Sequence, residues 1–385
     1  MMVVYEKKPL PDERRRYLVG DTPLLVWLLI MTIVLTIAVI LIFDPNVNAI
    51  INARSEVQRM IQGGSGYELA SDEEVSLYPV GSYQVRIEQG GLLYLDAKGR
   101  EHAWHETNLL SARIISRSYD SLILSDKDSP EFVVAKESGI VFADKVKSKA
   151  VGADLRGDDL LILDQGKDNK GEIRYYDLSH NEMKFVLEYQ ESGYPLLARI
   201  APGGNYFDVL ILDIDQVDPE CLVQRYGLDG KKKSEVRLSG YFGSFLHGTD
   251  DVVAAYCGDR IILADMETED LTLYAVPEGF SHLLADRTGI IVLGTASGAE
   301  ESWLVRLSSA GDNKTTAIPL LSAAPVAADG WLLLPSDKQL YLYDLTDSVL
   351  TSSVAFEAPL RQVYLAPGGR ALIITTEAVI PFLIQ

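Results

Sequence analysis

A strand–turn–strand pattern recurs from about residue 71 to the C-terminus, as short apolar segments separated by Gly, Asp, Asn and Ser. Such segments are typical of β-strands, and no long amphipathic helix interrupts them. Two copies match closely: Pro195–Gly204 and Pro359–Gly369 both contain Ala-Pro-Gly-Gly followed by an apolar run. Looser copies of the turn lie near Asp120, Gly157, Asp250, Gly289 and Gly330. The turn therefore occurs seven times, at intervals of 37 to 47 residues.

A second element falls between these turns, namely an apolar and often aromatic strand that ends in a polar residue. The clearest copies are Leu92–Asp96, Ile173–Asp177, Ile261–Asp265 and Leu340–Asp344, with weaker copies ending near Lys136, Asp229 and Ser308. Four short strands in roughly 40–45 residues make one blade of a β-propeller. The sequence therefore predicts an all-β propeller over 71–385 with seven blades, and counts of six or eight stay open.

The ends of the repeat indicate how the ring closes. Leu92–Asp96 belongs to the second half of a blade, and Pro367-Gly368-Gly369 belongs to the first half. N-terminal strands are therefore expected to complete the C-terminal blade, which would remove the exposed edges of an open array. A pair of β-sandwiches and a solenoid are the competing folds.

The Ala-Pro-Gly-Gly turns resemble the Ser-Pro-Asp-Gly turns of WD-repeat-like and quinoprotein-like bacterial propellers. The strands Tyr175-Tyr176-Asp177-Leu178 and Tyr341–Leu345 resemble the third strands of those blades. Anchor and body together resemble an uncharacterised family of single-pass bacterial membrane proteins with a propeller outside the membrane. This resemblance implies a fold but no reaction. The Trp-Asp and Gly-His dipeptides of strict WD repeats are missing.

An uncharged run of 20 residues, Leu24 to Phe43, precedes the repeats. In a helix it would cover roughly 30 Å, the thickness of a bilayer's hydrocarbon core. A cleaved signal peptide would have a shorter apolar region and a small-residue cleavage site. We therefore expect residues 24–43 to be an uncleaved transmembrane helix that contacts the lipid bilayer.

The flanks of this run predict its orientation. Five basic residues precede it, Lys7, Lys8, Arg14, Arg15 and Arg16, whereas the first one after it is Arg54. Because positive charge stays on the cytoplasmic side, residues 1–23 are expected inside and the C-terminal body outside a bacterial cell membrane.

Residues 44–70 have apolar side chains close to helical spacing, followed by Gly63-Gly64. They predict a short juxtamembrane helix and a Gly-rich linker. An amphipathic helix at the membrane or beneath the body is one interpretation. Weak self-association through a coiled coil is the other, although Arg54 occupies the seam.

Charge and cysteine content exclude some classes of function. The formal charge of the chain is −20, which argues against nucleic-acid binding and favours either simple solubility or attraction of cations or a basic protein. The only cysteines, Cys221 and Cys257, exclude a disulfide scaffold but leave one bridge open.

The body holds no recognisable catalytic constellation, since it lacks a Gly-x-Ser-x-Gly elbow and a phosphate-binding loop. His102 and His105 lie three apart and would point to opposite faces of a strand unless a bulge intervened. Acidic clusters occur at Asp126/Asp128, at Asp164/Asp168/Glu172 and at Asp213/Asp215/Asp218. None has the spacing of an EF-hand, and solvated turn carboxylates are the expected interpretation. Asp213, Asp215 and Asp218 are the best candidates for a metal site, and we assign no metal or other cofactor.

The sequence thus predicts a non-enzymatic interaction protein or assembly scaffold, displayed outside the membrane and bound to another envelope protein. An envelope hydrolase or lyase acting on carbohydrate or peptide in the central funnel is the alternative. A third hypothesis is a ligand sensor that works with a separate cytoplasmic protein.

Overall fold

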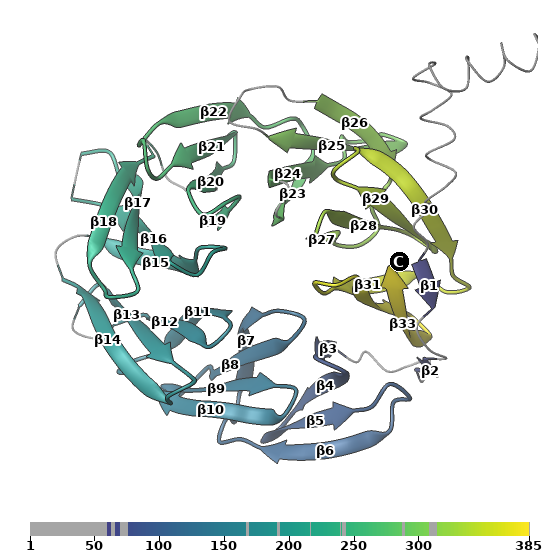
Figure 1. Ribbon diagram of the computed structural model, residues 1–385, viewed down its shortest axis with the longest axis horizontal. Coiled ribbons are helices and arrows are strands. Elements are labelled where there is room, and N and C mark those ends of the chain that lie inside the picture. Colours follow the sequence, from purple (N-terminus) through teal and green to yellow (C-terminus); the bar gives the residue numbers. More distant parts are fainter. Residues whose placement is uncertain are drawn as a thin grey trace, which may run out of the picture. The chain divides into compact units, whose positions relative to one another are not determined.

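The computed structural model describes residues 60–62, 66–69, 76–166, 169–190, 193–215, 217–238, 240, 244–286, 289–307 and 314–384. These residues form eight antiparallel sheets arranged as a ring around one axis (Figure 1). In seven sheets the four strands follow sequence order from the innermost to the outermost. The body from Gln58 onward is therefore a β-propeller, as the repeat predicts.

The first four blades run from Leu77 to Arg237. Blade 1 contains β3 (Leu77–Val80), β4 (Tyr83–Glu88), β5 (Gly91–Leu95) and β6 (Glu101–Glu106). Blade 2 contains β7 (Ala112–Arg117), β8 (Ser121–Asp126), β9 (Glu131–Lys136) and β10 (Gly139–Lys145). Blade 3 contains β11 (Ala150–Arg156), β12 (Asp159–Asp164), β13 (Gly171–Asp177) and β14 (Glu182–Tyr189). Blade 4 contains β15 (Tyr194–Ile200), β16 (Tyr206–Asp213), β17 (Glu220–Gly227) and β18 (Lys232–Arg237).

The second half of the ring runs from Ser244 to Ile384. Blade 5 contains β19 (Ser244–His247), β20 (Val252–Cys257), β21 (Arg260–Asp265) and β22 (Leu271–Ala275). Blade 6 contains β23 (Phe280–Asp286), β24 (Gly289–Gly294), β25 (Glu301–Leu307) and β26 (Lys314–Pro319). Blade 7 contains β27 (Val326–Ala328), β28 (Trp331–Ser336), β29 (Gln339–Asp344) and β30 (Val349–Ala355). Blade 8 contains β31 (Leu360–Leu365), β32 (Arg370–Thr375) and β33 (Ala378–Ile384).

Blade 8 is completed by the N-terminal strands β1 (Met60–Gln62) and β2 (Tyr67–Glu68), both antiparallel to β33. Met60 pairs with Ile384, and Glu68 pairs with Ala378. The two ends of the ring thus share one sheet, next to each other in Figure 1. This pairing confirms that N-terminal strands complete the C-terminal blade and leave β33 without a free edge.

The hydrophobic core is divided among the interfaces between blades. Each of eight clusters of buried residues joins two neighbouring blades, for example Phe207 of blade 4 with Leu161 of blade 3. The cluster that joins blade 8 to blade 1 includes Ile374 and Leu93, so the ring is also closed by packing. Burying one such side chain stabilises the fold by about 1.5–3 kcal/mol. Successive side chains of a strand point to opposite faces of the sheet, so each strand contributes apolar side chains to the interfaces with both adjacent blades.

The prediction of seven blades was wrong, because the described residues form eight. All seven turns found in the sequence do join the first and second strands of a blade, from blade 2 to blade 8. The missed turn is Gly81-Ser82 in blade 1, which lies 39 residues before Asp120. It has only two residues, and Gly81 takes a positive φ of 67° that suits a tight hairpin. The third strand of blade 8 was missed too, because no polar turn follows β33.

The predicted cytoplasmic tail (1–23), the predicted transmembrane helix (24–43) and residues 44–59 lie outside the described residues. Of the segment 44–70, for which the sequence predicts a helix and linker, Met60–Gln62 and Tyr67–Glu68 are strands of blade 8. The propeller thus begins before residue 71. Among the described residues, no helix has the length and apolar character required to span a membrane.

The two faces of the ring differ in their connections. We call the face that carries the connections between blades, such as 107–111 and 356–359, the linker face. It also carries the turns between second and third strands, such as 376–377. The opposite face carries the turns between first and second strands, such as Gly81-Ser82, and is called the turn face.

Candidate functional site

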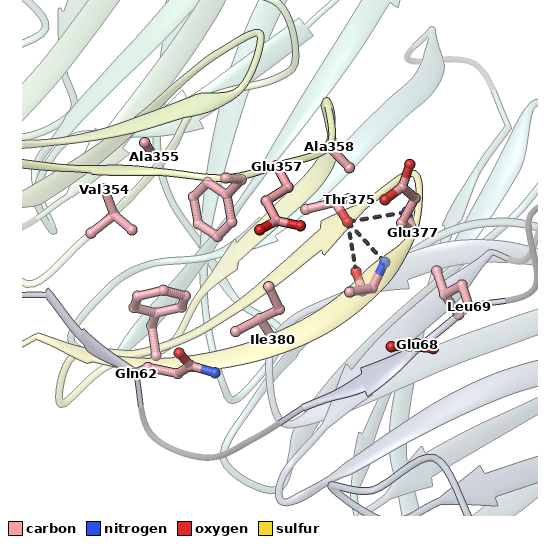
Figure 2. A pocket seen from close by; sticks show the side chains of 13 residues that line it. Gln62, Glu68, Leu69, Val354, Ala355, Glu357, Ala358, Thr375, Glu377 and Ile380 are labelled. Carbon is pink, nitrogen blue, oxygen red and sulfur yellow. Dashed lines mark hydrogen bonds between the residues drawn. The ribbon is translucent and has the colours of Figure 1, made fainter.

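A cavity of about 590 Å³ lies between blades 7 and 8. Its walls come from the end of β30 and the linker 356–359, from the turn between β32 and β33, and from the N-terminal strands β1 and β2 (Figure 2). Because the linker and the turn both belong to the linker face, the cavity reaches that face. It exists only because the N-terminal strands complete blade 8. We call it the blade 7–8 cavity.

The floor of the blade 7–8 cavity is apolar. Phe356 and Phe382 contact each other edge to face, with ring centroids 5.8 Å apart. Val354 and Ile380 extend this surface from β30 and β33. Phe356 is held in place by its backbone N–H, which donates to the carbonyl of Lys338 at 2.7 Å. An apolar or aliphatic group can therefore enter the cavity and replace water on a rigid surface.

The rim of the blade 7–8 cavity is acidic. Glu68, Glu357 and Glu377 line it together with Gln62, and no lysine or arginine is among the lining residues. All three glutamates are exposed, and within the described part of the chain none forms an ion pair. Three carboxylates around one opening produce a negative potential that attracts cations.

Local hydrogen bonds fix the positions of two of these glutamates. The buried hydroxyl of Thr375 accepts from the backbone N–H of Glu377 at 3.1 Å and from that of Ala378 at 2.8 Å. It donates to the carbonyl of Ala378 at 3.2 Å, which gives the compact turn in Figure 2. The carbonyl of Glu377 then accepts from Leu69 N–H at 2.6 Å, which places Glu68 beside the same opening. Sequence reasoning missed this site, since Glu68 is about 300 residues from Glu357 and Glu377 and joins them only on ring closure.

The candidate metal residues do not assemble into a metal centre. Asp213 ends β16, and its carboxylate accepts from the N–H of Asp215 at 3.0 Å. Asp215 forms an ion pair with Lys170 at 3.2 Å, and Asp213 lies 3.9 Å from Arg237. Asp218 lies in the following turn. Among the described residues, no group of three His, Cys, Asp or Glu side chains has an arrangement that could hold a metal ion.

Two other acidic clusters hold linkers between blades, and their key carboxylates are buried rather than solvated as the sequence predicts. Asp164 at the end of β12 is fully buried and accepts from the N–H groups of Lys147, Ser148 and Lys149 at 2.8–3.1 Å. Asp126 at the end of β8 likewise accepts from Ser111, Asp128 and Ser129. Burial alone would raise the pKa of Asp126, but these backbone bonds together lower it.

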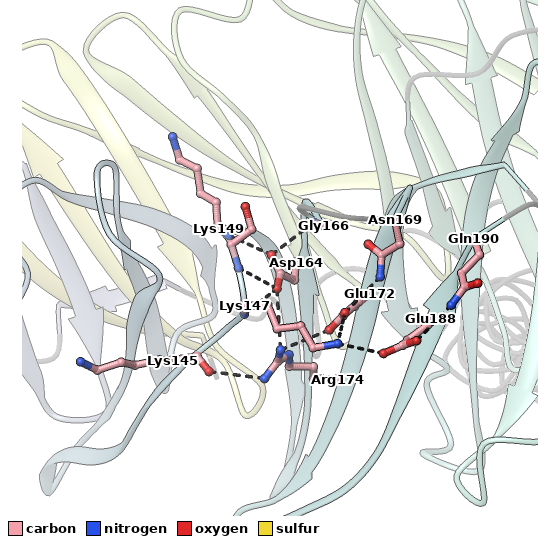
Figure 3. A network of polar contacts seen from close by, with 11 residues as sticks. Lys145, Lys147, Lys149, Asp164, Gly166, Asn169, Glu172, Arg174, Glu188 and Gln190 are labelled. Atoms are coloured by element: carbon pink, nitrogen blue, oxygen red, sulfur yellow. Dashed lines mark hydrogen bonds and ion pairs between the residues drawn. The ribbon is translucent and has the colours of Figure 1, made fainter.

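Asp164 belongs to a wider polar network between blades 2 and 3 (Figure 3). The buried carboxylate of Glu172 accepts from Arg174 at 3.2 Å and from Lys147 at 2.6 Å. Lys147 also donates to the exposed Glu188 at 2.8 Å. The carboxylates of Asp164, Glu172 and Glu188 thus all have partners within the protein, as expected of a structural joint between blades.

The two clustered histidines have separate partners. His102 and His105 both lie on β6, where a β-bulge interrupts the pairing with β5. The His102 ring stacks on Tyr83 at 4.5 Å, whereas the His105 ring contacts Tyr94 at 4.9 Å. Cys221 and Cys257, for which a bridge stayed open, do not form a disulfide. Cys221 belongs to the core cluster between blades 4 and 5, and Cys257 packs against that cluster.

The buried phenol of Tyr176 and the half-buried phenol of Tyr364 are expected to lower the stability of the propeller at alkaline pH. Burial raises the pKa of Tyr176 and of Tyr364 from 10.0 to about 12. A raised folded pKa stabilises the fold fully below the pKa of the unfolded chain, and that contribution is lost as the pH rises from 10 through 12. We expect late phenolate absorbance in an alkaline titration, with urea midpoints that fall over the same range. Simple ionisation of every tyrosine near pH 10 with no loss of stability would contradict this, and Tyr364→Phe should remove one late phenol.

Comparisons with known proteins show the family and the fold. The sequence pattern of DUF5711, a family of unknown function, matches residues 57–274, more than half of the chain, so the chain belongs to this family. No curated protein matches it. BamB from Moraxella catarrhalis is similar in structure with a TM-score of 0.52 at 12% identity, over 85% of this chain and 100% of that one.

Two further solved structures share the fold. Ika8, a computationally designed protein, has a TM-score of 0.56 at 11% identity, over 83% of this chain and 100% of its own. AztD from Citrobacter koseri has a TM-score of 0.50 at 13% identity, over 76% of this chain and 91% of its own. At such identities the likeness shows the propeller fold alone.

Proposed function

We propose that this DUF5711 protein is a non-catalytic binding protein that holds a basic segment of another envelope protein at the blade 7–8 cavity. In this proposal residues 24–43 anchor it in a bacterial cell membrane, with the propeller outside. The acidic rim of the cavity carries the proposal.

The chemistry of the cavity matches lysine and arginine side chains. Their aliphatic stems can cover the Phe356 and Phe382 rings while the charged heads stay at the rim near Glu68, Glu357 and Glu377. Arginine can in addition stack on an aromatic face. A cavity of about 590 Å³ has room for one or two such side chains, which fits a short segment of a protein.

The surrounding surface also suits a protein partner. Exposed apolar side chains stand in other connections of the linker face, with 78% of Leu110, 100% of Val217 and 44% of Leu320 accessible to solvent. Met60, the first described residue, pairs with Ile384 at the turn-face end of β33, so β1 begins on the face opposite the linker face.

The proposal predicts that removing the rim charges releases the partner. The full chain, solubilised in a non-ionic detergent, should capture an envelope protein from membranes of the same cells, and the triple variant Glu68→Gln, Glu357→Gln, Glu377→Gln should bind it roughly tenfold or more weakly. Each exposed ion pair contributes about 0.2–1 kcal/mol, and about 1.4 kcal/mol corresponds to tenfold. Capture by the native chain should weaken with added salt.

A matched control distinguishes the effect of the rim carboxylates from the effect of lowering the net negative charge of the protein. The variant Glu267→Gln, Glu300→Gln, Glu301→Gln removes three exposed carboxylates from blades 5 and 6 and should bind as the native chain does. A photocrosslinking residue at the exposed Ala355 should join the cavity to a lysine- or arginine-rich peptide of the partner. Equal loss in both triple variants, or crosslinks to acidic peptides, would refute the site.

The topology of the proposal has its own test. A cysteine introduced in the propeller should react with a membrane-impermeant maleimide on intact spheroplasts, whereas one introduced in residues 1–23 should react only after permeabilisation. The reverse pattern would place the propeller inside the cell.

A further inference from the structure

The strands that surround the central channel are rich in arginine, although the chain as a whole is acidic. The eight innermost strands are β3, β7, β11, β15, β19, β23, β27 and β31 (Figure 1). They contain five arginines, Arg113, Arg117, Arg156, Arg199 and Arg361, but two acids, Asp154 and Asp286, and neither Lys nor Glu. This local excess of positive charge contrasts with the formal charge of −20 of the chain.

Part of this charge has a structural role. Arg113 donates to the carbonyl of Ala150 at 2.7 Å, and Arg199 donates to that of Ala153 at 3.2 Å, so both join neighbouring blades. The two acids do the same, since Asp154 accepts from the N–H of Ile200 at 2.7 Å and Asp286 from that of Gly330 at 2.6 Å. These four side chains therefore stabilise the contacts between neighbouring blades. Arg117 takes part in none of these hydrogen bonds.

A cavity of about 460 Å³ lies in the channel between β7, β23, β27 and β31. Arg117 and Arg361 line it from two blades, with Gln362 and Tyr364 beside them. Its other lining residues are largely apolar, for example Val326 and Leu365, and none is acidic. Arg117 and Arg361 thus bring two positive charges to a cavity that has an apolar wall and no carboxylate in its lining.

Arg117 is positioned for a ligand. Its guanidinium lies 6.0 Å from the ring centroid of Tyr78 and 5.6 Å from that of Tyr364. The Tyr364 hydroxyl donates to the carbonyl of Leu77 at 2.9 Å, which fixes that ring. Within the described part of the chain, Arg117 forms no ion pair with a carboxylate. Aromatic faces hold the guanidinium plane while its N–H groups stay available.

We propose that this channel cavity binds a small organic anion whose carboxylate or phosphate group is held by Arg117, with the positive charge of Arg361 in the same lining adding to the attraction. Guanidinium groups recognise both kinds of acid through paired charge-assisted hydrogen bonds. The apolar wall favours a ligand with a hydrocarbon or aromatic body, and the volume suits a small molecule. This site is separate from the blade 7–8 cavity and from the protein partner proposed there.

The test uses the full chain in a non-ionic detergent and follows thermal unfolding by tryptophan fluorescence. Benzoate, phenyl phosphate and the neutral benzyl alcohol are titrated as probes, and dissociation constants follow from the concentration dependence of the unfolding temperature. We expect saturable stabilisation by benzoate, by phenyl phosphate or by both, and none by benzyl alcohol. The more effective anion identifies the acid group.

Matched arginine variants locate the effect. Arg117→Gln should raise the dissociation constant of the effective anion by roughly 10-fold or more, as expected for the loss of a charge-assisted hydrogen bond. Arg156→Gln changes the same charge at the end of β11, the corresponding position of the next blade, outside the cavity, and should leave binding unchanged. No saturable effect of either anion, an equal effect of benzyl alcohol, or equal losses in both variants would overturn the proposal.

Discussion

Replacement of Asp208 by asparagine is expected to lower the free energy of unfolding by about 3–5 kcal/mol, because it removes the buried carboxylate that pairs with the buried Arg225 and leaves only the exposed Asp251 beside it. Asp208 on β16 is fully buried. Its carboxylate accepts two bonds of 2.9 Å from Arg225 on β17, and one of its oxygens lies 2.7 Å from Nε2 of His247 on β19. One carboxylate thus joins blade 4 to blade 5.

The surroundings of Arg225 explain why the loss is large. Arg225 is 4% exposed and reaches Asp251 at 3.3 Å. Burial alone would lower the pKa of Arg225, but its bonds to Asp208 and Asp251 raise it above the ordinary value, so the guanidinium stays charged. An asparagine amide cannot accept the paired bonds of this group.

Urea unfolding followed by circular dichroism measures the effect. The matched control is Asp158→Asn, which removes an exposed partner of Lys136 and should change stability by less than about 0.5 kcal/mol. The double variant Asp208→Asn, Arg225→Met should recover part of the loss, since it removes the stranded charge. A cost below about 1 kcal/mol for Asp208→Asn would mean that water reaches the pair.

Removal of the N-terminal strands is expected to open the ring. A chain that begins at Ala70 lacks β1 and β2 and therefore loses all five residue pairs with β33. It also loses Met60 from the core cluster between blades 7 and 8. Burial of one such side chain and a few net hydrogen bonds together amount to about 5 kcal/mol. The unpaired edge of β33 would in addition promote association between chains.

The comparison is with a chain that begins at Gln58, the start of the compact unit. Thermal unfolding should show a clearly lower midpoint for the shorter chain, and sedimentation should show its association. Equal midpoints with a monomeric shorter chain would show that β1 and β2 add nothing to closure.

The strand–turn–strand repeat could be recognised in the sequence because each turn is formed by a few neighbouring residues, such as Gly, Asp and Pro. The residues near Asp120, Gly157 and Asp250 do lie between the first and second strands of successive blades. Gly81-Ser82 was missed, although the turns Gly157-Asp158 and Asp329-Gly330, which also have two residues and no proline, were found. The blade number therefore needed the pairing of the strands, which no single turn reveals.

The sites were much less predictable. The acidic residues that stand out by sequence proximity, such as Asp164 and Asp213, are occupied with backbone N–H groups or basic side chains. By contrast, Glu68 and Glu357 lie 289 residues apart in the sequence and meet only through the closed ring. Acidic residues that are close in the sequence thus mark turns and linkers between strands. The proposed binding surface is formed by glutamates that are distant in the sequence and close in the folded ring.

The sequence by itself determined the strand-and-turn repeat, the propeller, and the role of N-terminal strands in the last blade, since apolar alternation and turn residues act over a few positions. Only the tertiary structure decided the number of blades, the joint around Asp208, the acidic cavity between blades 7 and 8, and the arginine-lined channel. Each of these depends on contacts between blades. Such contacts are set by how eight sheets pack around one axis, and no short stretch of the chain encodes them.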